Sequence, residues 1–176
     1  MSPFFDSGIR FAVPNDASSI VTLLNSAYRG ETSKQGWTTE AHLIAGDRRT
    51  DENNLVKIMA KPESVFLVYQ EGDGPVSGCV NLQREGNRIY LGMFSVSPQL
   101  QGKGIGKQLL RAADGYARHL GCTSIFMSVI SVRDELIQWY KRHGYRDTGE
   151  RKPFIEDGLT GKHLRPLEFM ILEKEV

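Results

Sequence analysis

Short apolar runs and helical spacing alternate along the first third of the chain. A period of two predicts a strand, and apolar side chains recurring every three to four residues predict a helix. The resulting elements are a strand at 9–13, a helix at about 17–28 after the turn Pro14-Asn15-Asp16, a polar irregular segment at 30–39, a short helical stretch from Thr39 through Ile44, and a helix at 51–61 that Pro62 ends.

Three apolar runs then follow one another at close spacing. They cover 65–69, 76–82 and 89–96, and glycine-containing turns separate them. Short strands joined by tight turns predict an antiparallel meander.

The second half alternates helices and strands. Its predicted elements are a helix at about 104–120 ended by Gly121, a strand at 124–130, a helix at 133–143, a loop at 158–165, and last strands at 145–150 and 167–173. A strand, a crossover helix and another strand favour a parallel pair. The whole pattern predicts one α/β domain over 1–176, with a mixed sheet and helices on both faces.

Composition narrows the class of protein. Apolar residues are 40% and charged residues 24%, and the net charge is +1, which argues against a nucleic-acid or anionic-membrane partner. No apolar run is long enough to span a membrane, and the N-terminus lacks the pattern of a signal peptide, so we expect a cytoplasmic protein. Cys79 and Cys122 lie in apolar stretches, which predicts buried, reduced thiols. The four histidines lack metal-ligand spacing, so no metal is expected.

The segment 96–107 carries the most chemical information. Three alternating glycines, Gly102, Gly104 and Gly106, join a strand to a helix, so backbone amides and a positive helix end are accessible to a phosphate group. Lysine and arginine recur at positions 103, 107 and 111, along one side of that helix. The glycines match neither a P-loop nor the G-x-G-x-x-G dinucleotide fingerprint.

What the segment does resemble is the acyl-CoA loop of the GCN5-related N-acetyltransferase (GNAT) family, through Gln101-x-x-Gly104-x-Gly106. Residues 94–98 resemble the family's fourth strand and 125–130 its fifth. Leu136 to Tyr145 resembles its tyrosine helix and the turn that follows. The resemblance covers nearly the whole chain and implies a mixed, mostly antiparallel sheet of six to seven strands with helices on both faces.

The resemblance assigns roles to residues of the donor site. It implies acetyl-CoA as co-substrate, with its pantetheine arm against the backbone of Phe94, Ser95 and Val96. Its diphosphate would lie on the amides of the loop, which are those of Gln101, Gly102, Lys103, Gly104, Ile105, Gly106 and Lys107. Tyr140 would be the general acid that protonates the leaving thiolate, since a phenol keeps its proton at neutral pH.

Two features depart from the family pattern. The fourth strand lacks the glutamate that often serves as base, which leaves Glu40, Glu85 or a water chain through Ser95 and Ser128 as candidates. Arg133 stands where many relatives have asparagine, and its position favours the exposed N-terminus of a helix.

The acceptor pocket is expected from the N-terminal segments and a late loop. The candidates for contact with the acceptor are Tyr28, Trp37, Thr38, Glu40, Ser128 and Phe154. The implied reaction is direct acetyl transfer in a ternary complex to a primary amine of a small molecule or peptide, because no cysteine falls in the family-like active strands. The alternatives are a longer acyl-CoA donor and a non-catalytic CoA-binding module. A homodimer through an exposed sheet edge is a further expectation.

Overall fold

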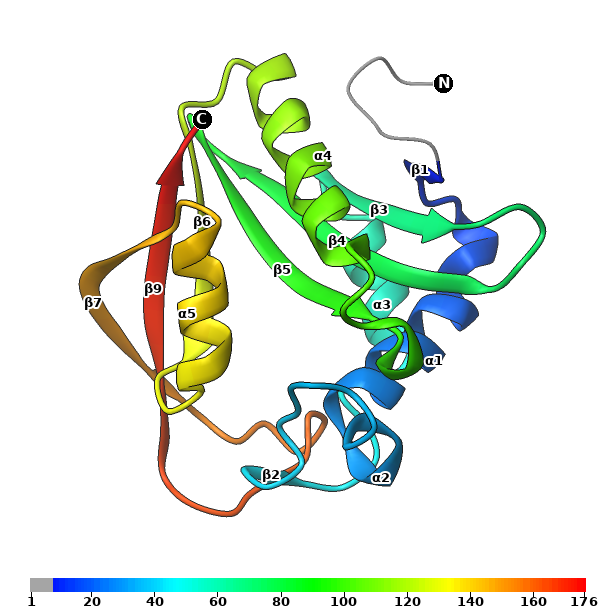
Figure 1. Cartoon of the computed structure of the whole chain (residues 1–176), viewed down its shortest axis with the longest axis vertical. Helices are drawn as coiled ribbons and strands as arrows, with labels where there is room; N and C mark the ends of the chain where they lie inside the picture. The colour runs from blue at the N-terminus through cyan, green and yellow to red at the C-terminus, as the bar shows by residue number, and fades with distance from the viewer. Residues whose placement is uncertain (1–7) are drawn as a thin grey trace.

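The computed structural model describes residues 8–176, and a seven-stranded sheet forms its centre (Figure 1). In chain order the strands of this sheet are β1 (Ile9–Phe11), β3 (Ser64–Gln70), β4 (Val76–Glu85), β5 (Arg88–Val96), β6 (Ser124–Ile130), β7 (Arg146–Phe154) and β9 (Leu167–Glu175). Their order across the sheet is β1-β3-β4-β5-β6-β9-β7. Only β5 and β6 run parallel, which confirms the predicted mixed, mostly antiparallel sheet. Its edges are β1 and β7, and pairing of two copies across one of them stays a prediction.

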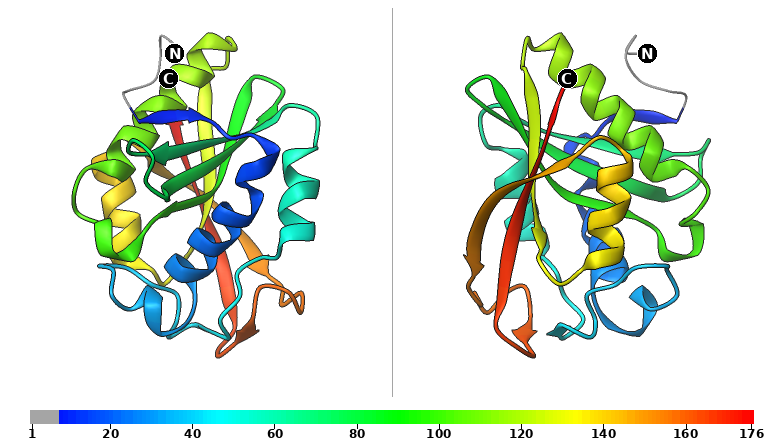
Figure 2. Two further views of the ribbon diagram at one scale, coloured as in Figure 1. Left: turned by 90° about the vertical axis from the view of Figure 1, so that its right-hand side faces the viewer. Right: turned by 60° about the vertical axis from the view of Figure 1, so that its left-hand side comes forward.

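Helices cover both faces of the sheet, as predicted (Figure 2). The long helix α4 (Ile105–His119) and α5 (Asp134–Arg142) lie on one face, and α1 (Ala17–Tyr28) and α3 (Glu52–Met59) lie on the other. The alternation along β3 shows the cause: Phe66 and Val68 pack under α1 and α3, while Leu67 between them packs under α4. One buried strand therefore serves two cores, because successive side chains point to opposite faces.

The central strands β5 and β6 pair over a short parallel ladder and then diverge. Arg88 to Tyr90 pair with Ser124 to Phe126, and beyond Tyr90 the C-terminal half of β5 has no partner on the β6 side. A bulge at Met93, whose φ is +47°, puts one more residue in β5 than in the facing part of β4. Because a bulge bends its strand and increases the local twist, it turns β5 away from β6 and opens the sheet.

The predicted helical stretch from Thr39 through Ile44 is wrong. The amides of Leu43 and Ile44 both donate to the carbonyl of Glu40, and the chain then enters a two-residue strand, β2 (Ile44–Ala45). This strand pairs with β8 (Lys162–His163), inside the segment predicted to be only a loop. A partner more than 100 residues away satisfies the backbone here, and local helical spacing cannot reveal such a partner.

The remaining elements are short and match the prediction in outline. One turn of helix, α2 (Gly30–Ser33), interrupts the segment expected to be irregular, and two 3-10 turns lie at Pro14–Asp16 and Pro98–Leu100. Both cysteines are buried and free, as predicted.

Candidate active site

A cleft of about 460 Å³ lies where β5 and β6 diverge. Its walls come from the end of α1, the segment around Trp37, the second half of β5, the glycine-rich loop with the start of α4, and one face of α5. Phe94, Ser95 and Val96 line it, and so do all predicted loop residues except Lys103. The cleft thus joins segments that are distant in sequence, and it is open at the glycine loop.

At the glycine loop, one end of this cleft has the features of an anion site. Gly102 and Gly104 have φ values of +83° and +86°, and a Cβ added at either would meet nothing within 4 Å, so the loop backbone faces open space. The first intrahelical bond of α4 runs from the amide of Gln108 to the carbonyl of Gly104, which leaves the amides before it without helical acceptors. Lys107 and Arg142 add positive charge to the same cleft. These residues therefore fit the diphosphate of a coenzyme A.

Aromatic rings form the wall between the two ends of the cleft. The ring centroids of Phe94 and Trp139 are 6.0 Å apart, and those of Trp37 and Trp139 are 6.5 Å apart. Gly106 packs against this wall, because a Cβ there would lie 3.3 Å from Phe94 Cζ and 3.4 Å from Trp139 Cη2. The wall is apolar and suits an alkyl arm.

Tyr140 lies on α5 and faces the cleft with only 5% of its surface exposed. Its ring meets Phe94 edge-on at 6.2 Å and Trp139 at 5.3 Å. Within residues 8–176 no group hydrogen-bonds the Tyr140 hydroxyl. Burial raises its pKa well above the usual value, so the phenol keeps its proton across the neutral range and can donate it.

Two carbonyls of β5 accept hydrogen bonds from side chains rather than from a neighbouring strand. The Tyr28 hydroxyl donates to the carbonyl of Phe94 at 2.6 Å, and Gln101 Nε2 donates to the carbonyl of Val96 at 3.1 Å. Burial raises the pKa of Tyr28 to about 12, so it remains a donor. Since a carbonyl oxygen has two lone pairs, each can accept a second donor from a ligand.

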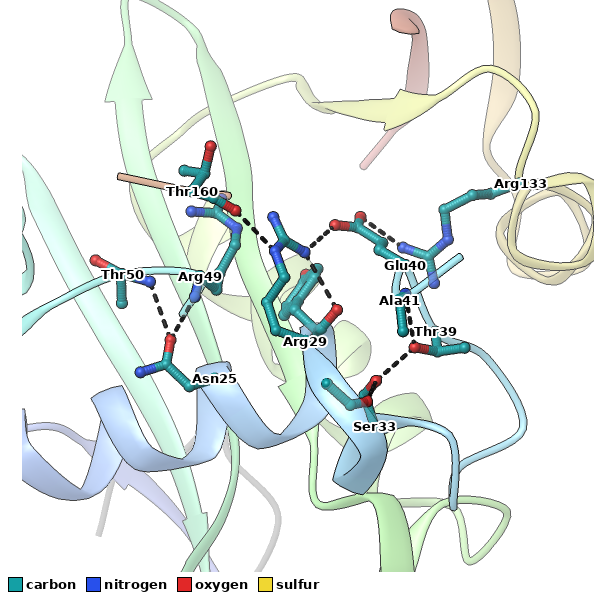
Figure 3. A network of polar contacts seen from close by, with 12 residues as sticks. Asn25, Arg29, Ser33, Thr39, Glu40, Ala41, Arg49, Thr50, Arg133 and Thr160 are labelled. Atoms are coloured by element: carbon teal, nitrogen blue, oxygen red, sulfur yellow. Dashed lines mark hydrogen bonds and ion pairs between the residues drawn. The ribbon is translucent and has the colours of Figure 1, made fainter. Parts of the chain in front are cut away.

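Glu40 is buried between two arginines, as Figure 3 shows. Its Oε1 lies 2.6 Å from Arg29 Nη1, and its Oε2 lies 2.8 Å from Arg133 Nη1. Arg29 in turn donates from Nε to the carbonyl of Thr160 at 2.8 Å. Both carboxylate oxygens therefore serve ion pairs that join α1, α5 and the late loop. The expected exposed position of Arg133 is wrong, since only 5% of its surface is accessible.

Five of the predicted site residues do not line the cleft: Lys103, the ion-paired Glu40, Glu85, Ser128 and Phe154. Glu85 is exposed at the end of β4, beside the turn to β5. Ser128 alternates with Met127 and Val129, which pack in the core with Tyr140, so its side chain points to the opposite face of β6. Phe154 stacks on Phe169 at 4.3 Å, because β7 and β9 are paired there.

The cleft also holds residues that the sequence did not single out for it. They are Ala27, Leu100, Arg133, Leu136, Trp139, Arg142 and His143. Five of them lie on α5 or cap its ends, at spacings of three and four from one another, so one helix face carries them. Helical periodicity around Tyr140 was therefore a usable signal for this wall.

Among residues 8–176 no group of three or more histidine, cysteine, aspartate or glutamate side chains could hold a metal ion. None of the helices in that range is long and apolar enough to cross a membrane.

Comparison with known proteins agrees with this arrangement. The chain is 28% identical over 121 residues to an IAA acetyltransferase of Azospirillum brasilense. This alignment covers 66% of this chain and 78% of that protein. It is 27% identical over 82 residues to a thialysine N-epsilon-acetyltransferase of Mus musculus, which covers 47% of this chain and 48% of that protein.

Solved structures show the same fold. A PaiA N-acetyltransferase from Thermoplasma acidophilum in complex with coenzyme A superposes with a TM-score of 0.68 at 18% identity, over 96% of this chain and 98% of that one. A ribosomal-protein-alanine N-acetyltransferase from Brucella melitensis gives a TM-score of 0.69 at 18% identity, over 96% and 99%. The model of the acetyltransferase (GNAT) family matches residues 20–145. Because that match spans most of the chain, the protein belongs to the GNAT family and is an acetyl-CoA-dependent N-acetyltransferase.

Proposed function

We propose that this enzyme transfers an acetyl group from acetyl-CoA directly to the primary amine of a small-molecule acceptor, within a ternary complex. The observation that carries the proposal is the Tyr140 hydroxyl, which has no hydrogen-bond partner among the described residues and lies on the wall of the cleft between the glycine loop and Thr38. A cleft with an anion-binding end and a separate acceptor end can hold both substrates at once. Cys79 is fully buried, and burial raises the pKa of its thiol, so it is unsuited to carry an acyl group.

The chemistry asks for two proton transfers. The amine nitrogen bonds to the acetyl carbonyl carbon, the carbon–sulfur bond breaks, and the thiolate receives a proton from Tyr140. The amine must lose a proton as well. None of the described residues lining the cleft is an aspartate or glutamate, and both oxygens of Glu40 are in ion pairs. An amine that arrives protonated gives its first proton to water, and the proton that the nitrogen loses as the amide forms passes to water or to the Tyr140 phenolate left after donation to the thiolate.

The names of the relatives support a small acceptor. Besides the thialysine acetyltransferase, the relatives include the spermine/spermidine N(1)-acetyltransferase of Bacillus subtilis, 33% identical over 64 residues. They also include the streptothricin acetyltransferase of Streptomyces lavendulae, 32% identical over 89 residues. These matches cover less than half of each of those two proteins. The chemistry of the cleft, rather than these partial matches, therefore indicates the acceptor class.

Release of coenzyme A thiol from acetyl-CoA tests the proposal. The enzyme is screened over amino acids, polyamines, arylalkylamines, aminoglycosides and lysine peptides, with butyryl-CoA as a second donor to test for a longer acyl group. We expect Tyr140→Phe to lower kcat by about 100-fold or more, the usual scale of general acid catalysis, with little change in acetyl-CoA affinity. Tyr145→Phe is the matched control, because the buried Tyr145 hydroxyl has no partner and lies outside the cleft.

Two results would contradict the proposal. One is unchanged kcat in Tyr140→Phe with acetyl-CoA still bound. The other is a burst of thiol release without acceptor together with a stable acetyl-enzyme, which would indicate a covalent route instead of a ternary complex.

A further inference from the structure

We propose that the acceptor carries a carboxylate beside its amine, as an amino acid does, and that Arg133 is the residue that binds this carboxylate. The inference rests on the proposed function and adds the chemical class of the acceptor. It follows from the distribution of charge along the cleft and from the hydrogen-bonding state of one buried guanidinium.

The cations that line the cleft fall into two groups. Arg142 is the last residue of α5 and lines the cleft together with Lys107 of the α4 first turn. Arg133 immediately precedes α5, so one helix length, about 13 Å, separates it from Arg142. The first group therefore suits the phosphates of the donor, and Arg133 lies at the other end of the cleft, with Thr38.

Arg133 has hydrogen-bond donors to spare. A guanidinium carries five N–H groups. Arg133 Nη1 donates to Glu40 Oε2 at 2.8 Å and Nη2 donates to Thr38 Oγ1 at 2.6 Å, whereas the buried Nε has no hydrogen-bond acceptor within residues 8–176. Each Nη keeps a second N–H. Since an unpaired buried donor costs free energy, an anion that displaces the Thr38 hydroxyl would improve the pairing of this group.

The buried ion-pair network that contains Arg133 has a net positive charge. Glu40 neutralises only one of the two arginines that it joins. Arg49, 5.5 Å from the ring centre of Tyr28, has Asp157 as an interacting anion. Glu135 accepts a hydrogen bond from Thr38 Oγ1 and its Oε1 is 4.0 Å from Arg133 Nε, but 46% of that side chain is exposed to water, which screens its charge.

These facts discriminate between classes of amine. A polyamine would place a second ammonium group in a cleft whose described lining includes no carboxylate, next to an arginine, and such a desolvated like-charge contact is unfavourable. An amino acid brings the missing anion and offers it to a planar donor fork that matches carboxylate geometry.

The competing interpretation gives Arg133 a purely structural role. In that case the Arg29–Glu40–Arg133 network only holds the segment around Trp37 in place. Loss of Arg133 would then lower the stability and the rates with all amines alike. A specificity role predicts a change in the ratio between acceptors, which a general loss of order does not produce.

Matched acceptor pairs provide the test. Initial rates are measured for phenylalanine against phenethylamine and phenylalaninamide, for methionine against 3-(methylthio)propylamine, and for lysine against cadaverine, with spermidine alongside. In each pair the second compound lacks the carboxylate charge. We expect kcat/KM to favour the amino acid by about 10- to 100-fold in at least one pair, as a charge-assisted bidentate contact allows.

The variants separate charge recognition from folding. Arg133→Gln and Arg133→Lys should reduce the amino-acid preference about 10-fold or more, with Lys retaining more of it than Gln. In Arg133→Gln the Glu40 carboxylate keeps Arg29 as its ion-pair partner, so no buried charge is left unpaired by this change. Arg84→Gln, an exposed arginine in the β4–β5 hairpin, is the control. Melting temperature and acetyl-CoA affinity are measured for every variant.

The outcomes are distinct. Faster turnover of the amines without a carboxylate, or of spermidine, overturns this inference and leaves the proposed function intact. An amino-acid preference unchanged in folded Arg133→Gln overturns the role of Arg133. If no acceptor reacts, the coenzyme A complex is titrated calorimetrically with phenylalanine and with phenethylamine, which tests recognition separately from turnover. Tighter binding of phenethylamine overturns the inference. Tighter binding of phenylalanine that is lost in Arg133→Gln supports it.

Discussion

The Gln101 side chain reaches from the glycine-rich loop to the segment that carries Trp37, and its Oε1 accepts a hydrogen bond from the backbone amide of Trp37 at 2.9 Å. Its Nε2 simultaneously donates to the carbonyl of Val96 on β5. The contact is close, because a Cβ at Gly36 would collide with the Gln101 amide. One side chain of the glycine-rich loop thus connects the end of the cleft proposed for the donor with the end proposed for the acceptor.

Removal of this connection should affect the acceptor more than the donor. Gln101→Ala loses two neutral hydrogen bonds, so we expect the acceptor KM to rise about 2- to 10-fold, the usual scale for such bonds. The acetyl-CoA affinity should change less, because the loop offers backbone amides. Gln99→Ala is the matched control, since Gln99 contacts Gln35 at 2.8 Å on the exposed side. A larger effect on acetyl-CoA affinity than on acceptor KM would contradict this assignment.

Glycine substitutions in the loop should act on the donor. Gly104→Val places a side chain at a φ of +86° and in front of the open loop, and Gly106→Val would collide with the aromatic wall. Both should weaken acetyl-CoA binding more than Gln101→Ala does. Backbone strain is controlled by comparing Gly104→Ala with Gly149→Ala. Gly149 also has a positive φ, +87°, and no atom within 4 Å of an added Cβ, but it lies on β7, outside the loop. Both alanine variants should lose about 1–2 kcal/mol of stability, and only Gly104→Ala should lose acetyl-CoA affinity in calorimetry.

Glu40→Gln should act mainly on folding. It leaves Arg29 and Arg133 buried without their shared counter-charge, and removal of one partner of a buried ion pair costs about 3–5 kcal/mol. We expect a large drop in melting temperature and an unchanged shape of the pH–rate profile in the remaining folded enzyme. Glu135→Gln, with its side chain 46% exposed, should change stability by less than about 1 kcal/mol. Loss of the acidic limb of the pH–rate profile in Glu40→Gln would instead identify Glu40 as the base.

The raised pKa of Tyr28 predicts that the folded protein loses stability at alkaline pH. The Tyr28 pKa is raised to about 12 by burial, from about 10 in the unfolded chain. A raised pKa stabilises the fold below pH 10, and this contribution disappears between pH 10 and 12, with a slope of about 1.4 kcal/mol per pH unit for one proton.

Tyr28→Phe tests this slope. The variant should be about 1 kcal/mol less stable at pH 8, because its hydrogen bond to Phe94 is lost, yet its stability should fall less steeply above pH 10. Tyr90→Phe, on β5, is the control. Denaturant titrations at pH 8, 10 and 11 measure both effects, and parallel curves for wild type and Tyr28→Phe above pH 10 would contradict the prediction.

Several features of this protein followed from the sequence because they depend on residues close together in the chain. The helix at 17–28 and the meander follow from periodicity, and the loop before α4 from glycine spacing. The same local logic placed Tyr140 on a helix, since Leu136 and Tyr140 share a face. Such patterns encode their own geometry, because helical and extended backbones repeat over a few residues.

The partners of polar side chains were decided only by the tertiary structure. Nothing around Glu40 indicates that Arg133, 93 residues later, shares its carboxylate, or that Gln101 meets the amide of Trp37. The same is true of Ile44, which enters a strand because His163 lies opposite. A carboxylate or an amide can pair with any donor that the chain path brings near, so its residue type does not specify its partner. The divergence of β5 from β6, which creates the cleft, likewise depends on a bulge whose register involves two strands at once.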